Sequence, residues 1–216
     1  MTAPSQAPFF EGSFPHTWEA EILPSRPLIL PLRHFVYPRD AEEVERGALE
    51  VLVRLKTPDA PCHSHLGTWD SSSTHSSNPQ PQEFLATCAL GFRDPAVPTG
   101  LWSMPHPDEI CAVSGGYAYV IDTTAPERFS MIAYRPVLQL IPILPENLLL
   151  FVGHHSILAW GVDGHAWQSE KLSDEGVTLE DMGGPILHGL GWNLISDKET
   201  PFALDLKTGL RIPPTR

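Results

Sequence analysis

The sequence predicts an all-β protein, built as an array of four-stranded antiparallel units. Its 23 prolines and 16 glycines among 216 residues favour short strands joined by turns over long helices. A pattern of apolar strand, turn and apolar strand recurs three times in the second half of the chain. The content of 42% hydrophobic and 19% charged residues is typical of a globular protein, and the length suffices to bury a core.

Each repeat joins apolar segments across a small or histidine-containing turn. The repeated segments cover residues 110–122, 148–161 and 185–196, at a period of roughly 35–40 residues that is typical of stacked supersecondary units. The expected strands are 100–103, 109–114, 117–122 and 129–133 in the first unit; 137–143, 147–152, 156–161 and 165–172 in the second; and 177–182, 185–189, 192–196 and 202–206 in the third.

Glycines mark the expected turns of these units. Asp163-Gly164 is a signal for a tight hairpin, and Gly115-Gly116 predicts a second hairpin with positive φ. Gly189 and Gly191 are also expected in a turn, which would separate two strands of the third unit.

Residues 99–212 resemble β-propeller blades of the WD or quinone-enzyme kind in strand count and period. The resemblance carries no specific motif, because Trp69-Asp70 lies in a polar segment and not at a strand end. Since propellers have four to eight blades, three units do not close a ring. Strands in 28–55 and 84–92 could supply a fourth unit; alternatively, two chains could pair into a six-bladed ring, or the units could form an open twisted sheet or sandwich.

The N-terminal part of the chain divides into residues 1–27, 28–55 and 56–82. Residues 1–27 form a proline-rich arm that we expect to be anchored by Phe9, Phe10, Phe14 and Trp18, the alternative being a frayed terminus. Residues 28–216 form a single all-β domain, in which Leu49, Val51, Val53 and Leu55 alternate with other residues and predict a strand. A helical turn is expected over residues 40–46, and residues 56–82 read as a low-complexity loop inserted between two strands.

The net charge of −12 argues against a nucleic-acid partner and against an anionic membrane surface. The sequence shows neither a secretory segment nor an apolar run of the roughly 20 residues that span a bilayer. The three cysteines, Cys62, Cys88 and Cys111, have no paired spacing and fit reduced thiols. We therefore expect a soluble cytoplasmic protein that binds no cofactor.

Histidines in the repeat turns are the candidates for chemistry. His154-His155 and His188 occupy turns that would share one face if the units stacked as blades, and neutral imidazole serves both acid/base catalysis and metal binding. The alternative is that each histidine ends a strand and bonds to nearby backbone. A second cluster, Cys62-His63-Ser64-His65, lies in the low-complexity loop without a second ligand pair, so no metal site is predicted there.

The sequence thus favours a non-catalytic protein-binding or scaffold module over an enzyme. Its partner would be another protein or a second copy of the chain, contacted through exposed aromatic residues, for which Trp160, Trp192, Phe9 and Phe10 are the candidates. The alternative is a hydrolase or metal-dependent enzyme that uses the turns of His154, His155 and His188. No catalytic motif supports it, since Ser114-Gly115-Gly116 lacks the glycine that a nucleophile elbow needs two residues before the serine.

Overall fold

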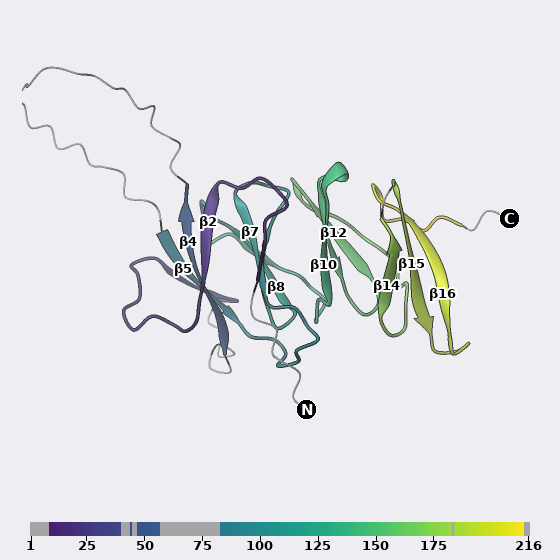
Figure 1. Ribbon diagram of the computed structural model, residues 1–216, viewed down its shortest axis with the longest axis horizontal. Coiled ribbons are helices and arrows are strands. Elements are labelled where there is room, and N and C mark those ends of the chain that lie inside the picture. The colour runs from purple at the N-terminus through teal and green to yellow at the C-terminus, as the bar shows by residue number, and fades with distance from the viewer. Residues whose placement is uncertain (1–8, 40–43, 45–46, 57–82, 183, 214–216) are drawn as a thin grey trace, which may run out of the picture.

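The computed structural model describes residues 9–39, 44, 47–56, 83–182 and 184–213 (Figure 1). These residues form sixteen β-strands and a 3₁₀ turn at Leu144–Glu146, and no α-helix lies among them. The all-β prediction is confirmed. The predicted helical turn at residues 40–46 and the predicted loop at 56–82 lie almost wholly outside the described residues.

The strands form four separate sheets, which we number I to IV along the row that they make in Figure 1. Sheet I has the order β2-β4-β5-β3, with β2 at Trp18–Leu23, β3 at His34–Tyr37, β4 at Ala48–Leu55 and β5 at Glu83–Ala89. Sheet II has the order β1-β6-β7-β8-β9, with β1 at Phe9–Glu11, β6 at Gly100–Ser103, β7 at Glu109–Ser114, β8 at Tyr117–Asp122 and β9 at Phe129–Met131.

Sheets III and IV are formed by consecutive antiparallel strands. Sheet III contains β10 at Gln139–Ile143, β11 at Leu148–Val152, β12 at Ile157–Gly161 and β13 at Gly164–Gln168. Sheet IV contains β14 at Val177–Asp181, β15 at Ile186–Asn193 and β16 at Lys198–Asp205. Among the described strands, two edge strands run parallel to their neighbours: β1 to β6, and β3 to β5.

Three apolar cores hold the row of sheets together. Sheets I and II share the cluster that contains Trp18, Val53 and Tyr119, and sheets II and III share the one that contains Trp102 and Phe151. Sheets III and IV share a third cluster, which includes Leu150, Leu187 and Phe202. Sheets II and III are therefore covered on both faces, whereas sheets I and IV each have one face on which no other sheet of the described residues packs.

The third predicted unit requires a correction. The strands expected at 185–189 and 192–196 are parts of one strand, β15, so sheet IV has three strands instead of four. Gly189 and Gly191 lie inside that strand and allow close approach of backbone, not a turn. A Cβ on Gly191 would lie 2.1 Å from the Leu172 carbonyl oxygen, and one on Gly189 would lie 2.5 Å from the Thr178 oxygen.

Two predicted hairpin turns are confirmed. Gly115 and Gly116 have φ of 55° and 75° between the paired residues Ser114 and Tyr117. Gly161 pairs with Gly164 across the turn Val162-Asp163, and Gly164 has a φ of 101°.

The first 27 residues, predicted as an arm, contribute β1 to sheet II and β2 to sheet I. Phe14 and Trp18 are buried in the cores, whereas Phe9 and Phe10 are exposed. None of the described residues forms a helix with the length and hydropathy that a membrane crossing requires.

Candidate functional site

The predicted histidine turn joins β11 to β12, and both of its imidazoles are exposed. Its backbone holds the connection between sheets III and IV. The carbonyl oxygen of His155 accepts from Leu172 N (2.7 Å), and that of His154 accepts from Gly176 N (3.0 Å). His155 Nδ1 lies 3.1 Å from the Ser173 carbonyl oxygen. These contacts match the alternative interpretation of the pair, in which each histidine ends a strand and bonds to nearby backbone.

His188 does not lie beside that turn. It is exposed on β15 and pairs with Asp181, the last residue of β14. Gly176, whose backbone N donates to the His154 carbonyl oxygen, lies just before the other end of β14. Because a strand rises about 3.4 Å per residue, the five residues of β14 place the two ends roughly 13 Å or more apart. In the described part of the chain, no group of three His, Cys, Asp or Glu side chains is arranged to hold a metal ion.

The four predicted aromatic contact residues differ in their surroundings. Trp160 is buried between sheets II and III, and its Nε1 donates to Glu109 Oε2. Phe9 packs edge-on against Trp102 at 4.8 Å between ring centroids, and Phe10 packs edge-on against Trp18 at 5.7 Å; both remain about half exposed. Trp192 is half-buried on β15 and lines a pocket.

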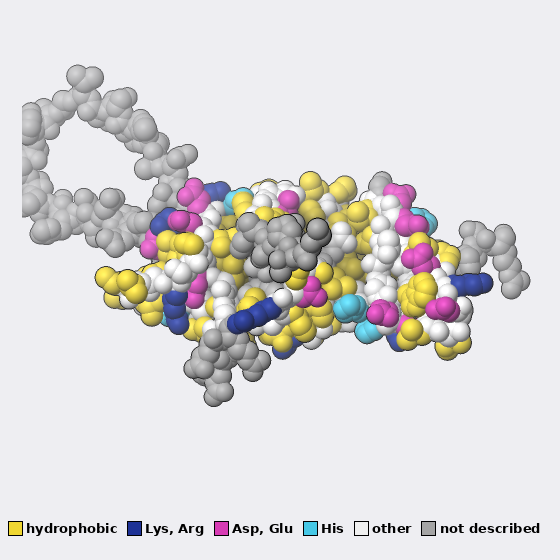
Figure 2. All heavy atoms as spheres, turned by 60° about the horizontal axis from the view of Figure 1, so that its bottom comes forward, with side chains coloured by type: hydrophobic (Ala, Val, Ile, Leu, Met, Phe, Trp, Pro, Cys, Tyr) yellow, Lys and Arg dark blue, Asp and Glu magenta, His cyan; other side chains and the backbone are white. Residues whose placement is uncertain are grey.

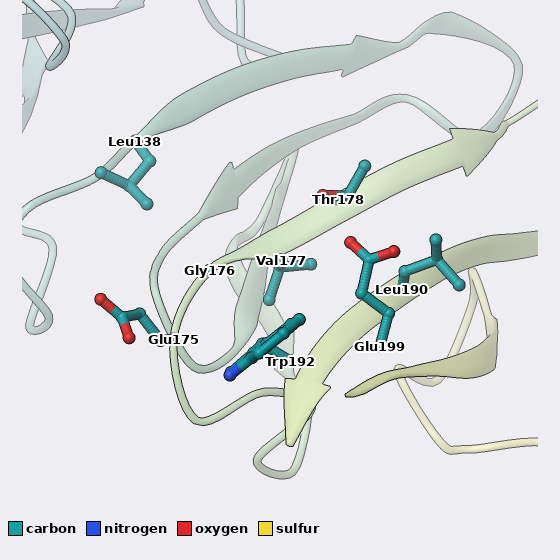
Figure 3. Close-up of a pocket in the computed structure, with 8 residues that line it drawn as sticks. All are labelled: Leu138, Glu175, Gly176, Val177, Thr178, Leu190, Trp192 and Glu199. Carbon is teal, nitrogen blue, oxygen red and sulfur yellow. The ribbon is translucent and has the colours of Figure 1, made fainter. Parts of the chain in front are cut away.

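This pocket lies at one end of sheet IV and has a volume of about 300 Å³ (Figure 3). Trp192 pairs with Glu199 of β16, and Leu190 pairs with Thr178 of β14, so all four side chains belong to the face of sheet IV that turns away from sheet III. We call this face of sheet IV the outer face. The pocket is completed by Glu175 and Gly176 of the connection between sheets III and IV, by Leu138, which precedes β10, and by Val177 of β14, which packs against the core between these sheets. Its lining residues are Leu138, Glu175, Gly176, Val177, Thr178, Leu190, Trp192 and Glu199.

Two glutamates line the same pocket as Trp192. Figure 3 shows Glu199, Leu190 and Val177 around the indole, whereas the Glu175 carboxylate points away from the ring on the other side of the backbone at Gly176. Both glutamates are exposed. An aromatic face attracts cations, and carboxylates add hydrogen-bond acceptors for an ammonium or guanidinium. The pocket is therefore suited to a cationic side chain that is accompanied by aliphatic groups.

Trp192 is a candidate contact residue from the sequence alone, whereas Glu175 and Glu199 are not among the predicted site residues. The available signal was the alternation along β15, where Leu190 and Trp192 share a face while Gly189 and Gly191 occupy the other. Large side chains on one face of a strand, with glycines on its other face, indicate that Leu190 and Trp192 contact another surface or line a pocket.

A second pocket, of about 410 Å³, lies where sheet I meets sheet II and includes the buried carboxylate of Glu50. Thr87 Oγ1 donates to Glu50 Oε2 (2.6 Å), and Arg26 Nε lies 3.9 Å from Oε1. His34 Nε2 lies 2.9 Å from the Thr87 hydroxyl and 3.2 Å from an Arg26 nitrogen. Burial and the Arg26 charge lower the pKa of His34. These contacts among Arg26, Glu50, His34 and Thr87 hold the connection between β2 and β3, which contains Arg26, against sheet I.

No family model matches the chain, and neither a curated protein nor a solved structure matches it.

Proposed function

We propose that the protein is a non-catalytic binding module, an open propeller-like array of four sheets whose terminal sheet docks a protein partner. The observation that carries the proposal is the pocket at the end of sheet IV, to which the outer face contributes Thr178, Leu190, Trp192 and Glu199. There a half-buried tryptophan, aliphatic side chains and two carboxylates line a pocket that no other part of the described chain fills. Tryptophan pockets of this kind dominate the energetics of many protein interfaces.

The chemistry of the pocket defines the partner. Leu138, Val177 and Leu190 offer apolar contact, and Glu175 and Glu199 offer negative charge. The matching ligand is a protein segment that presents aliphatic side chains next to an arginine or lysine. An acidic segment would be repelled by the same two carboxylates.

The placement of the histidines favours a binding module over the hydrolase or metal-enzyme alternative. That alternative needs His154, His155 and His188 in one site, and His188 stands at the other end of β14 from the His154-His155 turn. The free thiols of Cys88 and Cys111 support the proposed cytoplasmic location, because thiols stay reduced there.

The test is a peptide panel titrated against the full chain by calorimetry. Peptides that combine leucines with arginines should bind, and peptides in which glutamate replaces arginine should not. Glu199→Gln should weaken binding several-fold and Trp192→Ala should abolish it, whereas Glu127→Gln, at an exposed glutamate near sheet II, should leave it unchanged. Equal binding of the basic and acidic peptides, or full binding by Trp192→Ala, would refute the proposal.

A further inference from the structure

Ser114, the last residue of β7, carries a buried hydroxyl without a hydrogen-bond partner. The residue has no exposed surface. Its backbone is well bonded, since the Ser114 carbonyl oxygen accepts from Gly91 N at 3.0 Å. Among the buried side-chain nitrogen and oxygen atoms of the described residues, Ser114 Oγ is the one that lacks a partner. An unpaired buried hydroxyl lowers the stability of a fold, so its presence needs an explanation.

The hydroxyl belongs to the pocket of about 410 Å³ between sheets I and II. Ser114 follows Ile110 and Ala112 at alternate positions of β7, and both of these contact the core between the two sheets, so the Ser114 side chain faces the same gap. The lining residues are Ile22, Leu23, Pro24, Ala48, Leu49, Glu50, Leu90, Thr99 and Ser114. Leu49 and Ser114 are buried and form the floor of the pocket, whereas the exposed Pro24 belongs to its rim.

Hydrogen bonds hold the tip of the β7–β8 hairpin in place around this hydroxyl. Gly115 N donates to Thr99 Oγ1 (2.9 Å), so the second hydroxyl of the lining is occupied. Gly116 N donates to the Pro98 carbonyl oxygen (3.0 Å). A Cβ on Gly115 would lie 2.9 Å from Leu90 Cδ1, which shows how closely Leu90 covers the tip. The Ser114 hydroxyl is therefore presented from a fixed backbone.

The charged groups near the pocket are already engaged. Glu50 is the charged residue among the described lining residues, and its carboxylate accepts from Thr87 Oγ1 (2.6 Å) and lies 3.9 Å from Arg26 Nε. Further charged residues of sheet I alternate with core residues and face away from sheet II: Glu19, Glu21, Arg54 and Glu83. A charged ligand would find no free counter-ion in this lining, and an unpaired buried charge is costly. The pocket is therefore suited to a neutral molecule.

The surface at this end of the molecule is also apolar. Pro24 begins the connection from β2 to β3, in which Leu28 and Leu32 are fully exposed. In Figure 2, hydrophobic side chains project at the end of the molecule opposite the C-terminal sheet. Exposed aliphatic side chains accompany ligand-binding grooves as well as protein interfaces, and they agree with an apolar ligand.

We propose that this pocket binds a small neutral molecule that has an aliphatic body and one hydroxyl or carbonyl group, which hydrogen-bonds to Ser114 Oγ. Ile22, Leu49 and Leu90 would contact the aliphatic body. A serine hydroxyl both donates and accepts, so it can pair with either ligand group. Small-molecule sites have volumes of roughly 300–1,000 Å³, and this pocket is within that range. The site is independent of the partner proposed for sheet IV.

Titration of the full chain with octanol, followed in amide NMR spectra, tests the site. Octanol combines an aliphatic chain with one neutral hydroxyl. The amide signals of Leu49, Ser114 and Gly115 should shift to saturation, whereas those of sheet IV should not move. Ser114→Ala should weaken binding about three- to tenfold, which is the range for one neutral hydrogen bond. Octylammonium and octanoate, which carry a charge on the same chain, should bind more weakly than octanol.

Thermal unfolding without ligand gives a second readout. Ser114→Ala removes an unpaired buried hydroxyl and should leave the melting temperature unchanged or raise it. Ser103→Ala is the matched control, because Ser103 is also buried in sheet II but its Oγ accepts from Phe14 N at 2.8 Å. This control should lower the melting temperature and leave the affinity for octanol unchanged.

Several outcomes would overturn the inference: no saturable shift with octanol, shifts centred outside the pocket, equal affinities of the wild type and Ser114→Ala, or tighter binding of a charged analogue. A Ser114→Ala variant that fails to fold, or that loses as much stability as Ser103→Ala, would also overturn it, because the hydroxyl would then have a structural partner. None of these outcomes bears on the Trp192 pocket, which the peptide panel tests separately.

Discussion

Trp160 Nε1 donates a hydrogen bond of 3.0 Å to Glu109 Oε2, which joins sheet III to sheet II. The backbone carbonyl of the same glutamate accepts from Trp18 Nε1 of sheet I, also at 3.0 Å. Glu109 thus contacts the indoles of two neighbouring sheets from the one between them. The carboxylate of Glu109 therefore links sheet II to sheet III, and its backbone carbonyl links sheet II to sheet I.

The Trp160–Glu109 bond should contribute measurably to stability. A hydrogen bond to a charged group contributes about 1.5–3 kcal/mol, so Trp160→Phe and Glu109→Gln should each lower the free energy of unfolding, with a coupling energy of about 1 kcal/mol in the double-mutant cycle. Urea unfolding of the four proteins measures it. Additive effects of the two substitutions would show that the bond contributes nothing.

His34 should make stability fall in acid. Burial and the neighbouring Arg26 lower the pKa of His34 below its ordinary 6.5, so between the lowered value and 6.5 the unfolded chain binds more protons than the folded chain. The stability contributed by neutral His34 is therefore complete above pH 6.5 and is lost as pH falls toward the lowered pKa. His34→Gln should flatten this part of the pH profile in urea unfolding, and an unchanged slope would contradict the assignment.

Cys88 and Cys111 should resist thiol reagents in the folded protein. Both thiols are buried and free, and burial raises the pKa of each above its ordinary value, which leaves almost no thiolate. A Cys62→Ser variant should react with Ellman's reagent only after unfolding in urea. Rapid reaction of one thiol under native conditions would place it at an accessible surface.

Gly191 should tolerate no side chain. A Cβ there would meet the Leu172 carbonyl oxygen at 2.1 Å, so Gly191→Ala should destabilise the fold by about 1–3 kcal/mol through overpacking of sheet IV against the residues that precede it.

Gly184→Ala is the matched control, because no atom lies within 4 Å of a Cβ at that position and alanine reduces the entropy of the unfolded chain. It should be neutral or slightly stabilising. Equal effects of the two substitutions in thermal unfolding would contradict the close packing at Gly191.

The strands of sheets II and III could be predicted from local pattern alone. Leu149, Phe151, Leu158 and Trp160 belong to apolar segments bounded by turn residues, and the turns at Gly115-Gly116 and Asp163-Gly164 have the residues that their backbone requires. Sheet IV could not be divided correctly in this way. Glycine serves both tight turns and close packing within a strand, and only the approach of Leu172 to Gly191 distinguishes the two.

The sequence by itself determined the all-β class, most strand positions and Trp192 as a candidate contact residue, because these depend on periodicity and turn chemistry within a few residues. The tertiary structure decided what depends on distant pairs. It placed Phe9 beside Gly100, buried Glu50 beneath Arg26, separated His188 from the His154-His155 turn and brought Glu175 and Glu199 into one pocket with Trp192. Such neighbours are selected by the packing of whole sheets, and no local pattern in the chain encodes which sheet faces will meet.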